Sequence, residues 1–215
     1  QTRRGAMSQE YIDMMNPESV RLLIDAVYEP HFAHYKEEFG KTIRGFFSDE
    51  PRIGNTWFSA HACEYQYYET RVGLAGMAYP WREGEMVRRM MEVTGYDPMP
   101  YIAALWCDMG KKTAEIRHAY MDAVSSLYRD SFTRQLGDWC RAHGVQYIGH
   151  IIEDNESHAR LGCSAAHYFR SLDGQDMSGI DVVLHQILPG MSQYIHTASA
   201  AWNRCDPAFF DCVLA

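Results

Sequence analysis

The chain has 215 residues, and its 47% hydrophobic and 22% charged content is typical of a soluble globular protein with one sizeable core. Its 28 acidic and 20 basic side chains give a net charge of -8, which would repel a phosphate backbone and argues against nucleic acid as a partner. No apolar run approaches the roughly 18 residues of a membrane-spanning helix, so we expect no membrane partner either.

The first predicted element is a helix that begins after Asn16. The residues Asn16-Pro17-Glu18 combine a capping side chain, a ring that fits the first turn and a carboxylate at the positive end of the helix dipole. Apolar side chains then recur at helical spacing as far as Gly40, and we expect Pro30 to kink or divide the helix. The apolar stripe consists of Val20, Leu23, Ile24, Val27, Tyr28, Phe32, Tyr35 and Phe39.

A strand is predicted at residues 42–47, which are rich in β-branched and aromatic side chains. Asp49 and Glu50 follow, with Pro51 closing the segment, so the C-terminal end of this strand carries two carboxylates. Residues 54–81 then show no sustained period but hold many aromatic side chains. A connection of this length in a compact domain is expected to be functional, in part helical and in part bordering a site.

Two further helices are predicted. One covers residues 83–94 and ends at Gly95, and the longest in the chain covers residues 113–143 and ends at Gly144. The apolar face of the longest helix is expected to cover the core. It consists of Ile116, Tyr120, Val124, Leu127, Phe132, Leu136 and Trp139.

The second strand is predicted at residues 145–152, an apolar run that again ends in acids, Glu153 and Asp154. A helical stretch at residues 157–172 leads to a turn and to a third strand at residues 180–185. Strands separated by helices indicate a parallel α/β architecture, in which functional sites collect at the carboxyl ends of the strands. Three or four strands are too few for a closed eight-stranded barrel, so the chain is either part of a barrel or an open α/β domain.

Two glutamates are the candidate catalytic residues. Cleavage of a glycosidic bond needs a carboxylic acid that protonates the leaving oxygen and a carboxylate that acts as nucleophile or as base on water. Glu50 and Glu153 each follow a predicted strand, and such positions of a parallel barrel face one cleft. Asp49 and Asp154 are expected to orient or perturb this pair. The alternative for the Asp-Glu-Pro segment is an exposed turn.

Several segments of the chain are similar to one family of carbohydrate-active enzymes. In chain order they are Tyr11-Ile12-Asp13, Asn16-Pro17-Glu18, Glu38-Phe39-Gly40-Lys41-Thr42-Ile43, Gly45-Phe46-Phe47-Ser48-Asp49-Glu50-Pro51, Gly137-Asp138-Trp139-Cys140, His143-Gly144, Gly149-His150-Ile151-Ile152-Glu153-Asp154 and Asp176-Met177-Ser178-Gly179-Ile180-Asp181. With these segments the chain resembles bacterial glycoside hydrolases of the α-L-rhamnosidase type, glycoside hydrolase family 106 and its relatives. The segment that ends in Pro51 is the most specific of them.

The resemblance implies a catalytic domain with the fold of a (β/α)8 barrel of the TIM type, of which residues 1–215 would form a part. It matches Glu50 with the acid of the family's Asp-Glu-Pro segment and Glu153 with the acid of its Gly-His segment. The substrate it implies is an α-L-rhamnoside or a related plant-type sugar. The chain departs from the family pattern at Ser178, where proline is usual, and it ends before the last strand, where such enzymes tend to carry another acidic residue.

Further side chains are candidates for substrate contact. His150 lies in an apolar strand and is either a satisfied core group or a partner for a sugar hydroxyl or a neighbouring carboxylate. Trp57 and Trp81 are either core residues or flat faces for a sugar ring. Asp181, like Asp176, either hydrogen-bonds substrate hydroxyls or caps a turn.

We expect neither a cofactor nor a metal. The chain has no Gly-x-Ser-x-Gly elbow, no Gly-x-x-x-x-Gly-Lys loop for phosphate and no Gly-x-Gly-x-x-Gly. The alternative is a zinc cluster of His150, Glu153 and His158. Zinc-binding helices place their two histidines one turn apart, whereas here the end of a strand intervenes.

The competing class of function is a catalytically inactive carbohydrate-binding barrel module that keeps the aromatic cleft. The six cysteines lie far apart, which favours buried free thiols over disulfides and, with them, a reducing, cytoplasmic compartment. The chain begins without Met and ends within an apolar stretch. We therefore expect a fragment with an exposed apolar edge, present as a homo-oligomer or as part of a larger polypeptide.

Overall fold

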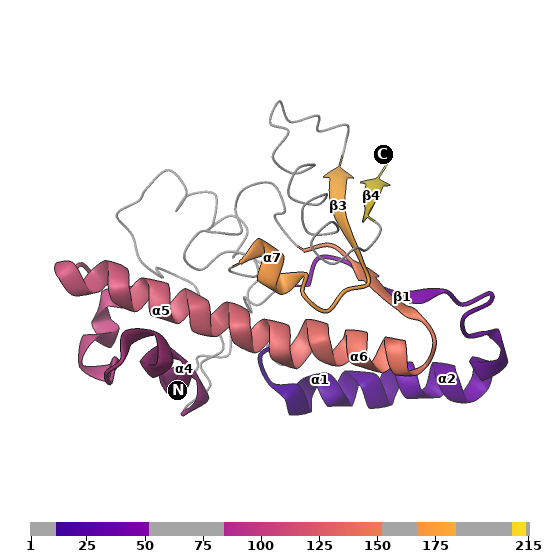
Figure 1. Ribbon diagram of the computed structural model, residues 1–215, viewed down its shortest axis with the longest axis horizontal. Helices are drawn as coiled ribbons and strands as arrows, with labels where there is room; N and C mark the ends of the chain where they lie inside the picture. The colour runs from indigo at the N-terminus through magenta and orange to yellow at the C-terminus, as the bar shows by residue number, and fades with distance from the viewer. Residues whose placement is uncertain (1–11, 52–83, 152–166, 184–207, 214–215) are drawn as a thin grey trace.

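The computed structural model describes residues 12–51, 84–151, 167–183 and 208–213, with residues 180–183 and 208–213 described by their backbone alone (Figure 1). Within these ranges a layer of long helices lies against a small parallel sheet. The prediction of a parallel α/β architecture is therefore confirmed. The described strands form one four-stranded sheet, and the (β/α)8 barrel of which the chain is predicted to form a part is not shown by them.

The four strands pair in chain order, and every neighbouring pair is parallel. Three of them confirm predicted strands, although the first begins three residues later than expected. The fourth coincides with a segment that the sequence shows only as apolar. The strands are β1 (Gly45–Ser48), β2 (Gln146–Gly149), β3 (Met177–Val183) and β4 (Ala208–Val213).

The first helical segment starts as predicted, because the Asn16 side chain accepts a hydrogen bond from the Glu18 backbone N–H and Pro17 occupies the first turn. The expectation that Pro30 kinks or divides the helix agrees with a change of helix type, since a π-helical turn at Ile24–Tyr28 separates the α-helices Pro17–Leu23 and Glu29–Tyr35. A π-helical turn precedes the proline, and in it the Glu29 N–H donates to the carbonyl of Ile24, five residues back. This wider turn accommodates the ring within a continuous helical segment. The segment consists of α1 (Pro17–Leu23), η1 (Ile24–Tyr28), α2 (Glu29–Tyr35) and η2 (Lys36–Glu38).

The π-helical turn also changes which side chains of this segment are buried. Val20, Ile24 and Tyr28 belong to the core as predicted, whereas Val27 is 37% exposed and Tyr35 54% exposed. The predicted apolar stripe is wrong at these two positions. The wider turn and the change to a 3-10 turn after residue 35 rotate the chain away from regular helical spacing.

The central helix is nearly as predicted and runs without a break from residue 111 to residue 142. It begins two residues earlier than expected and contains a second π-helical turn. All seven side chains of its predicted apolar face are buried. Gly95 and Gly144 end their helices with positive φ values of 75° and 73°, as predicted for stop residues. The elements are α4 (Glu85–Thr94), η3 (Met99–Leu105), α5 (Lys111–Tyr128), η4 (Arg129–Thr133) and α6 (Arg134–Ala142).

Aromatic side chains join the helices to one face of the sheet. The ring of Tyr28 stacks on Phe46 of β1 at a centroid distance of 4.2 Å, and Trp139 of α6 meets the same ring edge-on at 5.7 Å. The Trp139 indole N–H donates to Glu29 Oε1 at 3.0 Å. Phe132 of η4 contacts Tyr147 of β2. Both helical segments therefore cover the face that carries Phe46 and Tyr147 (Figure 1).

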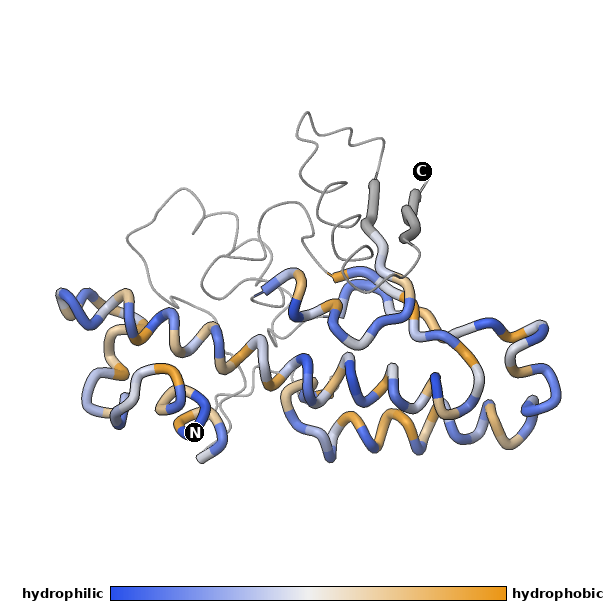
Figure 2. The backbone as a smooth tube through the Cα atoms, in the orientation of Figure 1, coloured by the Kyte–Doolittle hydropathy of each residue, from blue (hydrophilic) through white to orange (hydrophobic). Residues whose placement is uncertain are grey.

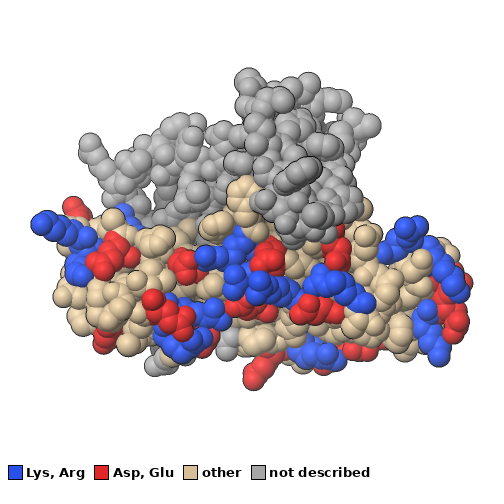
Figure 3. Space-filling model, in the orientation of Figure 1, with Lys and Arg blue, Asp and Glu red and all other residues tan. Residues whose placement is uncertain are grey.

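The pattern of hydropathy follows this packing. Hydrophobic and hydrophilic residues alternate along the helices at helical spacing (Figure 2). On the face shown in Figure 3, acidic and basic side chains lie intermixed over the helix layer. Among the described residues, no helix combines the length and apolar character that a bilayer crossing demands.

Candidate active site

The candidate site lies at the sheet edge where β1 and β2 end. The pairing of Ser48 with Gly149 fixes the register of the two strands at this edge. The next residue on each chain, Asp49 after β1 and His150 after β2, therefore leaves the sheet at the same level. Glu50 follows immediately. Carboxyl ends of parallel strands are where sites form in α/β proteins, so the described structure places these predicted residues together at such an edge.

Asp49 and His150 are in direct contact. The distance from His150 Nε2 to Asp49 Oδ1 is 3.2 Å. The two side chains differ sharply in exposure, because His150 is fully buried whereas the Asp49 side chain is 70% exposed. A buried imidazole thus lies behind a carboxylate that faces solvent. His150 is thus a buried core residue that also has a carboxylate neighbour, so its position is compatible with both alternatives left by the sequence.

The pair belongs to the sheet face that is turned away from the helices. Side chains alternate along a strand, and Phe46 and Tyr147 point to the helix layer, so Phe47 and Ile148 point the other way. The ring of Phe47 lies 5.7 Å from the His150 ring and is still 49% exposed. Phe47 is a residue of the site that the sequence analysis did not single out. Its position next to Phe46 in a strand was the available signal.

Glu50 has an unusual backbone conformation. Its φ is +40°, and within the described ranges it is the one residue other than glycine with a positive φ. Positive φ values are costly for residues with a Cβ, and strained residues of this kind concentrate at functional sites. The Glu50 side chain is partly buried and the following Pro51 is buried.

The floor of the site is a set of small and polar residues below the sheet edge. A Cβ built on Gly149 would lie 2.6 Å from Ser48 O and 3.1 Å from Gln175 Nε2, so only glycine fits here. Gln175 and Tyr147 are buried nearby. Burial raises the pKa of Tyr147, and the side chains of Ser48 and Gln175 oppose part of this rise. The neutral phenol is therefore the form present on the helix side of the sheet.

Asp176 holds β2 and β3 together. Its Oδ2 accepts a hydrogen bond from the Tyr147 N–H at 2.8 Å, and its own N–H donates to Tyr147 O at 2.8 Å. Its second oxygen accepts from Arg141 Nη1 at 2.8 Å. With both oxygens engaged, Asp176 fixes strand pairing, which favours the structural alternative for this residue. Asp181 lies in β3 and pairs with Asp211 of β4. Only its backbone is described.

Other predicted site residues lie outside the described ranges. These are the second candidate catalytic residue, its neighbouring acid and the two tryptophans, namely Glu153, Asp154, Trp57 and Trp81. Within the described ranges, no three His, Cys, Asp or Glu side chains gather closely enough to hold a metal ion. Of the alternative zinc cluster, only His150 is described. The structure therefore brings together Asp49, Glu50 and His150 of the predicted site.

Comparison with known proteins supports the fold. No family model matches the sequence, and no curated protein matches it either. Among solved structures, the rhamnosidase from Novosphingobium sp. PP1Y is similar, with a TM-score of 0.61 and 16% sequence identity. The similarity covers 89% of this chain but only 16% of the rhamnosidase chain, so this chain spans about a sixth of that enzyme's length. At this identity the likeness defines an α/β fold shared with part of a larger protein.

Proposed function

We propose that this chain is part of the catalytic domain of a glycoside hydrolase, in which Glu50 and Glu153 form the acid and base pair. The domain would be a (β/α)8 barrel, and residues 1–215 would contribute a portion of it. The expected substrate is an α-L-rhamnoside or a related plant-type sugar. Asp154, Asp181, Trp57 and Trp81 are proposed to contact that substrate.

The observation that carries the proposal is the backbone of Glu50. The sequence nominates this residue as the catalytic acid, and the same residue has the strained φ of +40° at the carboxyl end of β1. Backbone strain is retained when the surrounding structure enforces a geometry that function requires. The two lines of argument are independent, because the sequence pattern contains no information about φ.

Two further observations support a carbohydrate site. Phe47 offers a half-exposed aromatic ring beside Asp49 and His150, and sugar sites combine such apolar surfaces with a few polar groups. The structural neighbour is described as a rhamnosidase, which agrees with the resemblance seen in the sequence. The site is also rich in carboxylates, and these accept hydrogen bonds from neutral hydroxyl groups while repelling phosphate.

In the proposed mechanism the two glutamates have unequal roles. Glu50 protonates the glycosidic oxygen as the leaving group departs, and Glu153 attacks the anomeric carbon or activates a water molecule. As the proton donor, Glu50 would have to be protonated when the substrate binds.

The test is hydrolysis by the full-length protein carrying Glu50→Gln. This change keeps the shape but removes the proton donor, so substrates with poor leaving groups should be hydrolysed about 10²- to 10⁴-fold more slowly. Nitrophenyl glycosides need little protonation and should be affected much less. Glu153→Gln should slow both kinds of substrate equally. The matched control is Glu37→Gln, an exposed acid in η2 beyond the opposite end of β1, which should leave both rates unchanged.

Two results would contradict the proposal. Equal losses for Glu50→Gln on both kinds of substrate would show that Glu50 is not the acid. If wild-type full-length protein binds sugars but hydrolyses none of a panel of nitrophenyl glycosides that includes α-L-rhamnoside and β-galactoside, the chain belongs to an inactive carbohydrate-binding module instead.

A further inference from the structure

We propose that Asp49 and His150 act as one unit that recognises a single hydroxyl group of the substrate and so sets specificity. Asp49 would accept the hydroxyl hydrogen with one carboxylate oxygen, while His150 holds the other oxygen in place. His150 is a positioning residue in this scheme. The inference rests on the proposed function for its substrate class, a neutral sugar, but its structural part can be tested separately.

The two oxygens of the Asp49 carboxylate differ in their surroundings. Oδ1 lies 3.2 Å from His150 Nε2, on the side of the buried ring. The side chain as a whole is 70% exposed, so the carboxylate remains open to a ligand from the solvent side. A carboxylate that is held from behind loses little conformational freedom when a ligand binds, which strengthens the binding that results.

The chemistry of the two groups fixes where the protons lie. An ionised carboxylate only accepts hydrogen bonds, so the ring nitrogen that faces Oδ1 must carry a hydrogen. Asp49 then presents an acceptor with negative charge. Its preferred ligand is a hydroxyl donor, and an anionic ligand would be repelled.

Rigid packing supports the positioning role of His150. The ring is fully buried and packs against Phe47, which comes from the neighbouring strand. The adjoining Gly149 lies so close to Ser48 that its backbone has little room to shift. The imidazole is therefore fixed relative to the sheet, and Asp49 lies in contact with it at 3.2 Å. Since Glu50 is the next residue, the bound hydroxyl would also set the distance of the sugar from the proposed acid.

Three variants of the full-length protein separate this inference from a general loss of structure. Asp49→Asn replaces the outward acceptor with an amide that can donate. His150→Phe keeps a packed ring but removes the N–H. His150→Gln keeps a nitrogen donor near the position of Nε2. The first two should lower kcat/KM for the best nitrophenyl glycoside by about 10- to 100-fold, the range for one hydrogen bond to a charged group, mainly through KM. His150→Gln should recover most of this loss.

The decisive comparison uses monodeoxy analogues of that glycoside. For wild-type protein, one analogue should be a poorer substrate by the same 10- to 100-fold, and for Asp49→Asn that analogue and the parent sugar should be nearly equal. The matched control is Asp138→Asn, whose side chain is 76% exposed and pairs with Arg141 on α6 rather than with a histidine. It should retain the full discrimination. Discrimination that survives in Asp49→Asn would overturn the inference.

A measurement that needs no turnover keeps this inference distinct from the proposed function. Nitrogen-15 NMR of the histidine rings should show a hydrogen on His150 Nε2, and the signal should shift in Asp49→Asn. A hydrogen on Nδ1 alone would overturn the inference even in an active enzyme. If the glycoside panel is not hydrolysed, titration with L-rhamnose and its deoxy analogues tests the same discrimination by binding affinity. Equal affinities of wild type and Asp49→Asn for L-rhamnose would again overturn the inference.

Discussion

Gly137 of α6 lies directly against Gly174 of the turn that precedes β3. A Cβ built on Gly137 would lie 1.9 Å from Gly174 O, and one built on Gly174, whose φ is +146°, would lie 2.6 Å from the Thr133 carbonyl. Because neither residue has a side chain, the backbone of the turn packs directly against the backbone of α6. This contact also brings Asp176 within reach of the Tyr147 backbone, and so contributes to the strand register at the site.

Gly137→Ala should destabilise the protein, although alanine is normally the better helix residue. The added methyl group collides with backbone that cannot move aside, and overpacking of this kind costs about 3 kcal/mol. Urea unfolding of the two proteins measures the difference. Gly95→Ala is the matched control, since it has open space around it and should cost only about 1 kcal/mol for its left-handed backbone. An unchanged stability of Gly137→Ala would contradict the contact.

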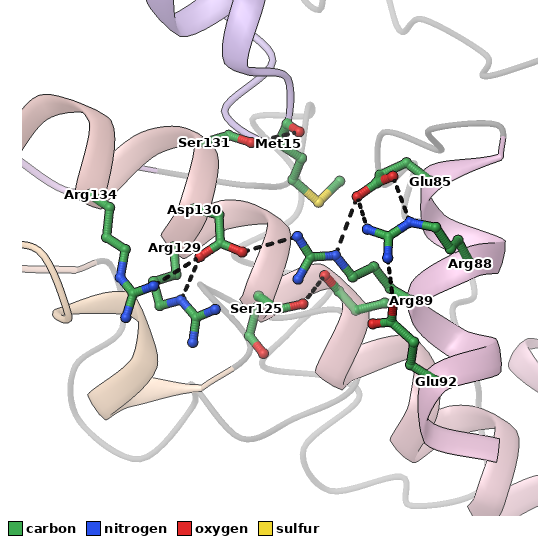
Figure 4. Close-up of polar contacts among 12 residues, drawn as sticks. Met15, Glu85, Arg88, Arg89, Glu92, Ser125, Arg129, Asp130, Ser131 and Arg134 are labelled. Carbon is green, nitrogen blue, oxygen red and sulfur yellow. Dashed lines mark hydrogen bonds and ion pairs between the residues drawn. The ribbon is translucent and has the colours of Figure 1, made fainter. Parts of the chain in front are cut away.

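Asp130 is the centre of an ion-pair cluster between α4 and the central helix (Figure 4). Its carboxylate contacts Arg129 at 2.7 Å, Arg89 at 3.0 Å and Arg134 at 3.4 Å. Burial alone would raise the pKa of Asp130, but the hydrogen bonds and charges of Arg129 and Arg89 outweigh burial and lower the pKa below its ordinary value. The ionised form is therefore favoured in the folded protein.

Asp130→Asn should lower the free energy of unfolding by about 2 kcal/mol at pH 7, because charged hydrogen bonds are lost. A carboxyl with a lowered pKa stabilises the fold above its unfolded pKa of about 4 and loses this contribution as the pH falls through the folded value. The difference between variant and wild type should thus vanish towards pH 2. Urea unfolding at several pH values measures it. Glu92→Gln, in an exposed pair with Arg88, should change stability by less than about 0.5 kcal/mol at any pH.

The helices were more predictable from the sequence than their irregularities. A buried stripe leaves a direct trace in the spacing of apolar residues, which is why the face of the central helix was correct throughout. The π-helical turn η4 left a weaker trace, the five-residue step from Leu127 to Phe132. A single wide step is easily read as a gap in the stripe. β4 was not predicted, because one apolar segment without a following helix has no repeated pattern to support it.

The site was predictable in its location but not in its geometry. Acids that follow buried strands are expected at one edge of a parallel sheet, and Asp49 and Glu50 were found there. The contact between Asp49 and His150 depends on the register of β1 against β2, which is set by partners far apart in sequence. The φ of Glu50 likewise reflects tertiary packing, and local propensity would not place a glutamate in that conformation.

Two described cysteines should differ in reactivity. Cys140 is buried, and burial raises the pKa of its thiol to about 12, so very little thiolate exists at pH 8. Cys107 is exposed on the surface. Iodoacetamide at pH 8 should label Cys107 in the native protein and reach Cys140 only after unfolding in urea. Peptide mass spectrometry identifies the labelled positions, and rapid native labelling of Cys140 would contradict its burial below the sheet.

The strain at Glu50 predicts a trade between stability and activity. Glu50→Gly should relieve a backbone cost of about 1 to 3 kcal/mol, offset by roughly 0.4 to 1 kcal/mol of added freedom in the unfolded chain. The net expectation is a protein that is about 1 kcal/mol more stable and inactive in hydrolysis. On substrates with poor leaving groups Glu50→Gln should lose activity in the same way, but it should be no more stable, because it keeps the Cβ and the strain.

The control for Glu50→Gly is Glu37→Gly, since Glu37 has no positive φ to relieve. That change should lower stability by about 0.5 to 1 kcal/mol through backbone entropy, opposite in sign to the effect at Glu50. Urea unfolding followed by circular dichroism gives both values, and hydrolysis of a glycoside with a poor leaving group gives the activities. If Glu50→Gly is less stable than wild type, Glu50 is not strained, and the observation on which the proposed catalytic role rests is lost.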